Sequence, residues 1–80
     1  MAQPFYGTYS AVVVENVDPE QRFRLKVRVP EVAPDYDVWA VPSWPPGQTP
    51  EQHQLPDVGA AIWVEFEHGD ANYPIWSGVQ

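Results

Sequence analysis

The sequence predicts a small all-β domain, and three observations lead to this fold class. Apolar and polar residues alternate with a period of two in several segments, as they do along strands with one buried face. Turn-forming and proline-rich segments separate these runs and leave no room for a helix longer than a turn or two. The 80 residues, 44% of them hydrophobic, suffice for one core of marginal size. We therefore expect a single domain over residues 1–80.

Residues 5–17 are predicted to form the first strand, because they are rich in aromatic and β-branched residues and lack helical periodicity. Residues 11–14 are apolar on both faces. This is typical of a central strand covered on two sides, or of a barrel strand whose outer face meets a partner. Residues 16–21 combine Asn, Asp and Pro, which predicts a turn that makes a hairpin with the next strand.

The most regular alternation lies in residues 21–30, the predicted second strand. One face carries Phe23, Leu25, Val27 and Val29, and the other carries Arg22, Arg24, Lys26 and Arg28. These four cations are all the Lys and Arg of the chain, and at roughly 3.3 Å per residue they make a basic row about 20 Å long. We expect Glu15 of the first strand to face Arg22 or Arg24 across the hairpin.

Three further strands are expected in the rest of the chain. Residues 38–41 form a short third strand, and the proline-rich residues 42–57 form a long loop, since neither a ladder nor a helix survives so many prolines. Residues 60–67 form the fourth strand, residues 68–72 a turn, and residues 73–79 the fifth strand.

Five short strands, an opening hairpin and a long connection between the third and fourth strands fit the five-stranded Greek-key barrel called the OB-fold. Closing the barrel removes the exposed edges that would otherwise promote aggregation. A small SH3-like barrel is the structural alternative.

The charge distribution argues against nucleic acid as the partner. The net charge is −7, and residues 31–80 hold eight Asp and Glu but no Lys or Arg. Nucleic-acid affinity rests largely on neutralising phosphates, and OB domains that bind single strands add aromatic residues on which bases stack. Phe23, the aromatic residue of the basic strand, alternates to the opposite face. A single-stranded nucleic-acid-binding protein is therefore the alternative function rather than the favoured one.

No residue pattern predicts catalysis, a metal site or a cofactor. His53 falls in the proline-rich loop and His68 in a turn, with no cysteine and no metal-binding motif. Glu65 and Glu67 are paired carboxylates about 7 Å apart, but outward acids on a strand usually face solvent or a partner. We expect no catalytic residues, no metal, no cofactor and no enzyme activity.

The outward residues of the fourth strand fit an assembly interface better than they fit a catalytic site. If Ile62, Val64 and Phe66 point inward, Trp63 shares the outer face with Glu65 and Glu67. An outward Trp flanked by carboxylates fits an interface in which the aromatic ring anchors and the charges set the register. Trp39 and Trp76 are expected in the core.

The basic row is expected to meet carboxylates, either on neighbouring strands of the same subunit or across an axial interface between subunits. Reversing two of its arginines to glutamate should then leave the fold intact and weaken assembly. The candidate interface residues are Arg22, Arg24, Lys26, Arg28, Trp63, Glu65 and Glu67.

Two stretches resemble the OB domain of phage baseplate assembly protein V and of its valine-glycine-repeat relatives in type VI secretion. The first, residues 16–30, has an Asn-x-Asp-Pro turn, a basic alternating strand and a closing Pro. The second, residues 55–78, contains Pro-x-Val-Gly, Trp-Val-Glu-Phe-Glu, Gly-Asp and Tyr-Pro-Ile-Trp-x-Gly, and Trp39-Ala40 also matches. The resemblance spans nearly the whole chain.

The resemblance implies a homotrimeric hub or spike adaptor at the baseplate centre of a phage tail or contractile injection device. Its partners would be its own copies and the hub, tail-tube or spike-tip proteins. It would act in the virion tail or an equivalent particle assembled in the bacterial host cytoplasm, without inserting into a membrane. Because the chain ends after the fifth predicted strand, we expect no β-helical needle and no lysozyme domain.

Overall fold

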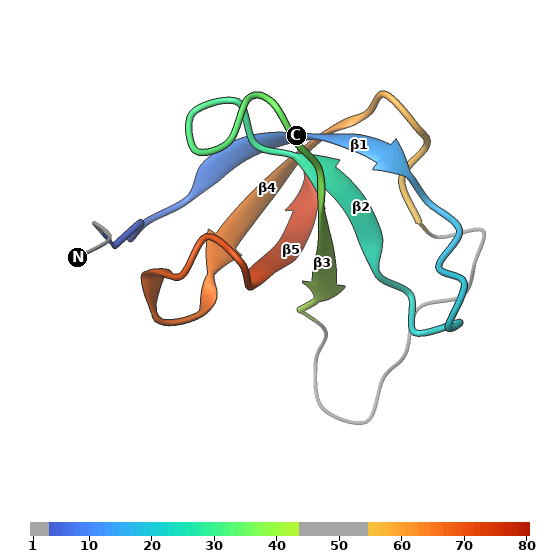
Figure 1. The fold of residues 1–80 in the computed structure, drawn as a ribbon. Helices are drawn as coiled ribbons and strands as arrows, with labels where there is room; N and C mark the ends of the chain where they lie inside the picture. Colours follow the sequence, from blue (N-terminus) through green and yellow to red (C-terminus); the bar gives the residue numbers. More distant parts are fainter. Residues whose placement is uncertain (1–3, 44–54) are drawn as a thin grey trace.

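Five β-strands close into a barrel in the computed structural model, which describes residues 4–43 and 55–80 (Figure 1). The strands are β1 (Tyr9–Glu15), β2 (Leu25–Arg28), β3 (Val38–Pro42), β4 (Ala61–Phe66) and β5 (Pro74–Val79), and a 3-10 turn, η2 (Glu67–Gly69), follows β4. Their order around the barrel is β1-β2-β3-β5-β4, in which β3 and β5 are parallel and the other neighbours antiparallel. The predicted five-stranded OB-fold is confirmed.

Side chains that alternate along each strand fill the inside of the barrel. The buried apolar residues of the strands are Ala11, Val13, Leu25, Val27, Ala40, Ile62, Val64, Phe66 and Trp76. Burying one Ile or Val side chain contributes roughly 1.5–3 kcal/mol, so this interior stabilises the barrel substantially. The predicted inward face of β4 and the predicted core position of Trp76 are confirmed.

The second strand is shorter than predicted, and this changes the basic row. Gln21 and Phe23 have positive φ angles of 55° and 59°, so the backbone before residue 25 turns instead of extending. Of the four cations, only Lys26 and Arg28 lie in β2. The continuous row of four on one strand face was a wrong prediction, because a left-handed residue interrupts the two-residue alternation.

The hairpin register differs from the prediction as well. Glu15 lies opposite Lys26, and not opposite Arg22 or Arg24. The register shifts between Val13 and Glu15, which is the signature of a β-bulge in β1. A second shift, between Trp63 and Val64, lies in the β4–β5 pair. Such bulges bend strands and so help a small sheet to close.

The boundaries of the long loop need one correction. Pro42, predicted as its first residue, is the last residue of β3 and lies opposite Trp76 of β5. Proline is tolerated at a strand end because no ladder hydrogen bond is required of its nitrogen. At the other end of the predicted loop, Leu55 and Pro56 are buried. Residues 44–54 of the predicted loop, including His53, lie outside the described residues.

The N-terminal segment packs against the turn between β4 and β5. The amide of Phe5 donates a 2.8 Å hydrogen bond to the carbonyl of Gly69, and the ring of Phe5 contacts those of Tyr9 and Phe66. Gly69 has a φ of 72°, and a Cβ there would lie 3.1 Å from the Phe5 nitrogen. The turn therefore requires glycine at this position. Within the described residues no helix is long and apolar enough to cross a membrane.

Candidate assembly interface

The loop between β1 and β2 is organised by one buried carboxylate, that of Asp18, which is 5% exposed. It accepts hydrogen bonds from the backbone amides of Glu20 at 2.9 Å, Arg22 at 3.1 Å and Arg24 at 3.3 Å. The Arg24 guanidinium adds two more, from Nε at 2.8 Å and from Nη2 at 3.0 Å. This network explains how the backbone can pass through two left-handed residues before β2 begins.

Arg24 and Asp18 stabilise each other's charged forms. The hydrogen bonds from the Arg24 guanidinium, together with those from backbone amides, hold the pKa of the Asp18 carboxyl well below its usual value, although burial opposes the shift. The same contact raises the pKa of Arg24. Arg24 also donates to Glu20 at 2.7 Å. Arg24 is therefore part of the loop structure rather than a cation left for a partner.

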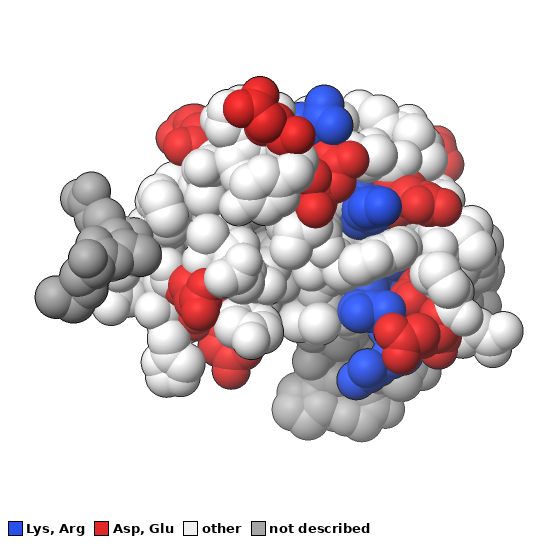
Figure 2. All heavy atoms as spheres, viewed as in Figure 1, with Lys and Arg blue, Asp and Glu red and all other residues white. Residues whose placement is uncertain are grey.

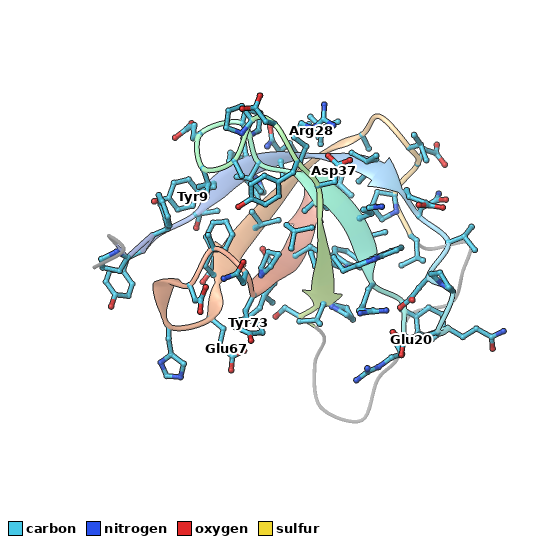
Figure 3. The ribbon with its side chains drawn as sticks, viewed as in Figure 1. Tyr9, Glu20, Arg28, Asp37, Glu67 and Tyr73 are labelled. Carbon is cyan, nitrogen blue, oxygen red and sulfur yellow. The ribbon has the colours of Figure 1, made fainter. Side chains whose placement is uncertain are left out.

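Arg28 forms an ion pair with Asp37, the residue before β3, with 2.8 Å between Nε and Oδ1 (Figure 3). Its side chain is 47% exposed, so the pair contributes only about 0.2–1 kcal/mol. Two of the four cations thus meet carboxylates of their own subunit, the first of the two expected arrangements. Figure 2 shows the basic side chains of this face lying beside acidic ones.

Trp39 lies on the outside of the barrel, so its predicted core position was wrong. Ala40 is the fully buried residue at this point of β3, and Trp39 therefore points outward next to Lys26 of β2. The Arg24 guanidinium carbon lies 5.2 Å from the centre of the Trp39 ring, and the Lys26 ammonium 5.8 Å. Both distances are within the range of cation–π interactions.

Trp39 also bears on the nucleic-acid alternative. It places an aromatic ring beside the cations, which the second strand by itself does not supply. However, the ring already interacts with Arg24 and Lys26, and Arg24 and Arg28 are ion-paired. A net charge of −7 adds long-range repulsion of phosphates. The arrangement favours a structural role for these residues over base stacking.

An exposed apolar surface, here called the outer patch, crosses β4, β5 and β3. Its apolar members are Trp63, Val41 and the half-buried Ile75, and Glu65 is its carboxylate. Glu65 lies opposite Ile75, and Ile75 opposite Val41, so the side chains are neighbours on adjacent strands. Trp63 is 42% exposed and Val41 45%. Contiguous apolar surface of this kind marks interaction sites more often than scattered exposed residues do.

The predicted interface residues do not form one surface. Trp63 and Glu65 point outward from β4 as expected, but Glu67 belongs to η2 and lies beside Tyr73 at the β4–β5 turn (Figure 3). The outward positions of Val41 and Ile75 were not predicted. A four-residue apolar run such as 38–41 does not by itself reveal which residues face inward.

His68 and the acidic residues of the described ranges do not form a metal-binding group. His68 is exposed at a φ of 53°, and residues 4–43 and 55–80 contain no group of three or more His, Cys, Asp or Glu placed to hold an ion. The grooves that described residues line on this side of the barrel lie between the β4–β5 turn and its neighbours.

The strand order around the closed barrel is that of an OB-fold domain, and the outer patch is an exposed apolar surface on it. Residues 9–80 match the model of one such family, the type VI secretion system/phage-baseplate injector OB domain. The chain belongs to this family. A search of curated proteins found no match. The family gives the chain a structural role in a phage baseplate or type VI injector, and it is not an enzyme class.

Proposed function

We propose that the chain is a homotrimeric hub or spike adaptor at the baseplate centre. It joins the tail tube or hub to the spike tip, and it acts by binding and geometry rather than by catalysis. It assembles in the host cytoplasm and remains in the tail of a phage or a related contractile injection device.

The observation that carries this proposal is the outer patch in a member of a baseplate family. Trp63 offers the large aromatic side chain that dominates binding energy in many interfaces, and Glu65 beside it supplies a charge that selects register. A chain of 80 residues also has a core of marginal size, and burying an outer strand face between copies would add to it.

The test is self-association measured by light scattering over a range of concentrations. Trp63→Ala should weaken association at least tenfold, because truncating an interface anchor costs roughly 2 kcal/mol or more. Val58→Ala is the matched control, since Val58 is 60% exposed but outside the outer patch. Equal association by the wild-type chain and both variants would show that the outer patch is not the subunit interface.

Single-stranded nucleic-acid binding is the alternative that the same preparation can test. It requires affinity for an oligonucleotide that falls steeply with added salt. The ion pairs of Arg24 and Arg28 and the net charge of −7 are the observations against it.

A further inference from the structure

A mostly apolar groove of about 340 Å³ lies on the outside of the barrel, between β3 and the turn that leads into β5. Its lining consists of Val38, Trp39, Val41, Tyr73 and Pro74, with Arg24, Glu67 and Asn72 as polar neighbours. The volume is at the small end of ligand pockets, which suits one or two protein side chains better than a larger cofactor. Only Val41 is shared with the outer patch.

The backbone beside this groove leaves one edge of β3 open. Residues 38–40 pair with β2 on one side, whereas β5 pairs with β3 only at Val41 and Pro42. Among the described residues, the first half of β3 therefore has no strand on its second side. An open edge next to an apolar groove is the arrangement that an extended peptide uses when it adds to a sheet.

The opposite wall of the groove is held in place before any partner arrives. The Glu67 amide donates to the Tyr73 carbonyl at 2.9 Å, and the Tyr73 amide donates to the Asp70 carbonyl at 3.0 Å. The Phe5–Gly69 hydrogen bond fastens the same turn to the N-terminal segment. Tyr73 is 60% exposed on this fixed turn, so its ring is available without a loss of loop entropy.

The charges around the groove select the partner. Glu67 lies at the groove (Figure 3), is exposed and forms no ion pair with a described residue. No Lys or Arg occurs in residues 31–80. Arg24, the cation in the lining, is neutralised by Asp18 and Glu20. A second cation, Lys26, lies 5.8 Å from the Trp39 ring on the far wall of the groove. At the Glu67 end of the groove, in a chain of net charge −7, the potential is negative, which attracts a cation of a partner segment and disfavours phosphates.

We propose that this groove binds an extended segment of a neighbouring protein in which large apolar residues alternate with Lys or Arg. An apolar side chain enters between Trp39 and Tyr73, the peptide backbone bonds to the open edge of β3, and a cation meets Glu67. The inference deepens the proposed function by giving the chemistry of an axial partner. Only one part of the inference rests on the proposed function, namely that the partner is a component of the baseplate.

The test is a selection from a yeast-displayed library of random decapeptides against the full 80-residue chain. Enriched peptides should alternate apolar and basic residues. Tyr73→Ala should weaken their binding at least tenfold because it removes one wall of the groove. Glu67→Lys should weaken it similarly because it reverses the charge, whereas Val58→Ala should have no effect. Circular dichroism of each variant establishes that it is folded.

Three results would overturn the inference: no enrichment, enrichment of acidic peptides, or equal binding by the wild-type chain and folded Tyr73→Ala. Displacement of the peptides by a twelve-residue oligothymidine with micromolar affinity would instead identify the groove as a nucleic-acid site and would also overturn it. Light scattering of the same variants separates this outcome from the proposed function. A variant that loses peptide binding but keeps its self-association reports on the groove and not on the trimer. Loss of self-association in Trp63→Ala reports on the trimer interface and not on the groove.

Discussion

At the scale of single residues, Asp18 does more for this fold than its place in a turn suggests. The Asn-x-Asp-Pro pattern predicts a reversal of the chain at residues 16–21, and the structure has one. What the pattern does not reveal is that the carboxylate is buried and gathers three backbone amides and a guanidinium. The partners come from residues two to six positions later, in a conformation that propensity alone does not specify.

Asp18→Asn should lower the free energy of unfolding by about 3 kcal/mol. The amide keeps the size of the side chain, but it weakens the hydrogen bonds to the backbone and leaves Arg24 without its main ion-pair partner. Urea unfolding at neutral pH measures the change. Asp35→Asn, at an exposed position, is the control and should be within about 0.5 kcal/mol of the wild type. A similar loss in both variants would contradict this role.

The pH dependence of the same pair has a definite sign. Because the pKa of Asp18 is lowered in the folded state from its usual 3.8, the unfolded chain takes up the proton first as the pH falls. The stabilisation by Asp18 is complete above about pH 5 and decreases below about pH 4. The difference in stability between wild type and Asp18→Asn should therefore shrink between pH 5 and pH 2.5. A constant difference would show that ionisation of Asp18 is not its cause.

At the scale of elements, β2 shows where sequence alternation works and where it stops. From Leu25 to Arg28 the alternation predicts correctly which side chains are buried. Before Leu25 the same alternation continues in the sequence, but the Asp18 network imposes positive φ angles at Gln21 and Phe23. Local hydrogen bonding to one carboxylate thus outweighs a pattern that would suit a longer strand.

Charge reversal in this element should separate structure from assembly. Arg24→Glu should destabilise the fold by about 3–5 kcal/mol, because it places a third carboxylate beside Asp18 and Glu20. Arg22→Glu, at an exposed side chain, should change stability by no more than about 0.5 kcal/mol. Thermal unfolding followed by circular dichroism compares the two. Equal stability of both variants would restore the earlier expectation that arginine reversals leave the fold intact.

The third strand was predicted in its place but not in its orientation. Residues 38–41 are apolar throughout, so no alternation distinguishes an inward Trp39 from an outward one. Ala40 faces the core because the opposite residue on β2, Leu25, fills the interior. Which residues of an all-apolar strand face inward is decided by its pairing with strands that are distant in the sequence. A short segment of sequence does not contain this information.

At the scale of the whole molecule, the number of strands, the barrel and the family were accessible from the sequence. Turn signals and proline density divide the chain into five segments, and the motif of residues 55–78 is specific enough to indicate the family that residues 9–80 match. The surfaces were less accessible. The outer patch joins residues from β3, β4 and β5, and the groove joins β3 to the β4–β5 turn, so both depend on the closed topology.

The most direct test of the central claim, that this chain is a self-assembling structural component of a baseplate, is its native mass by analytical ultracentrifugation. Measured from micromolar to millimolar concentration, the mass should rise to three times that of the 9.1 kDa chain. Added salt should change this association less than Trp63→Ala does, since the outer patch is mainly apolar. A mass that stays at that of one chain over the whole range would contradict the trimer and the interface assigned to it.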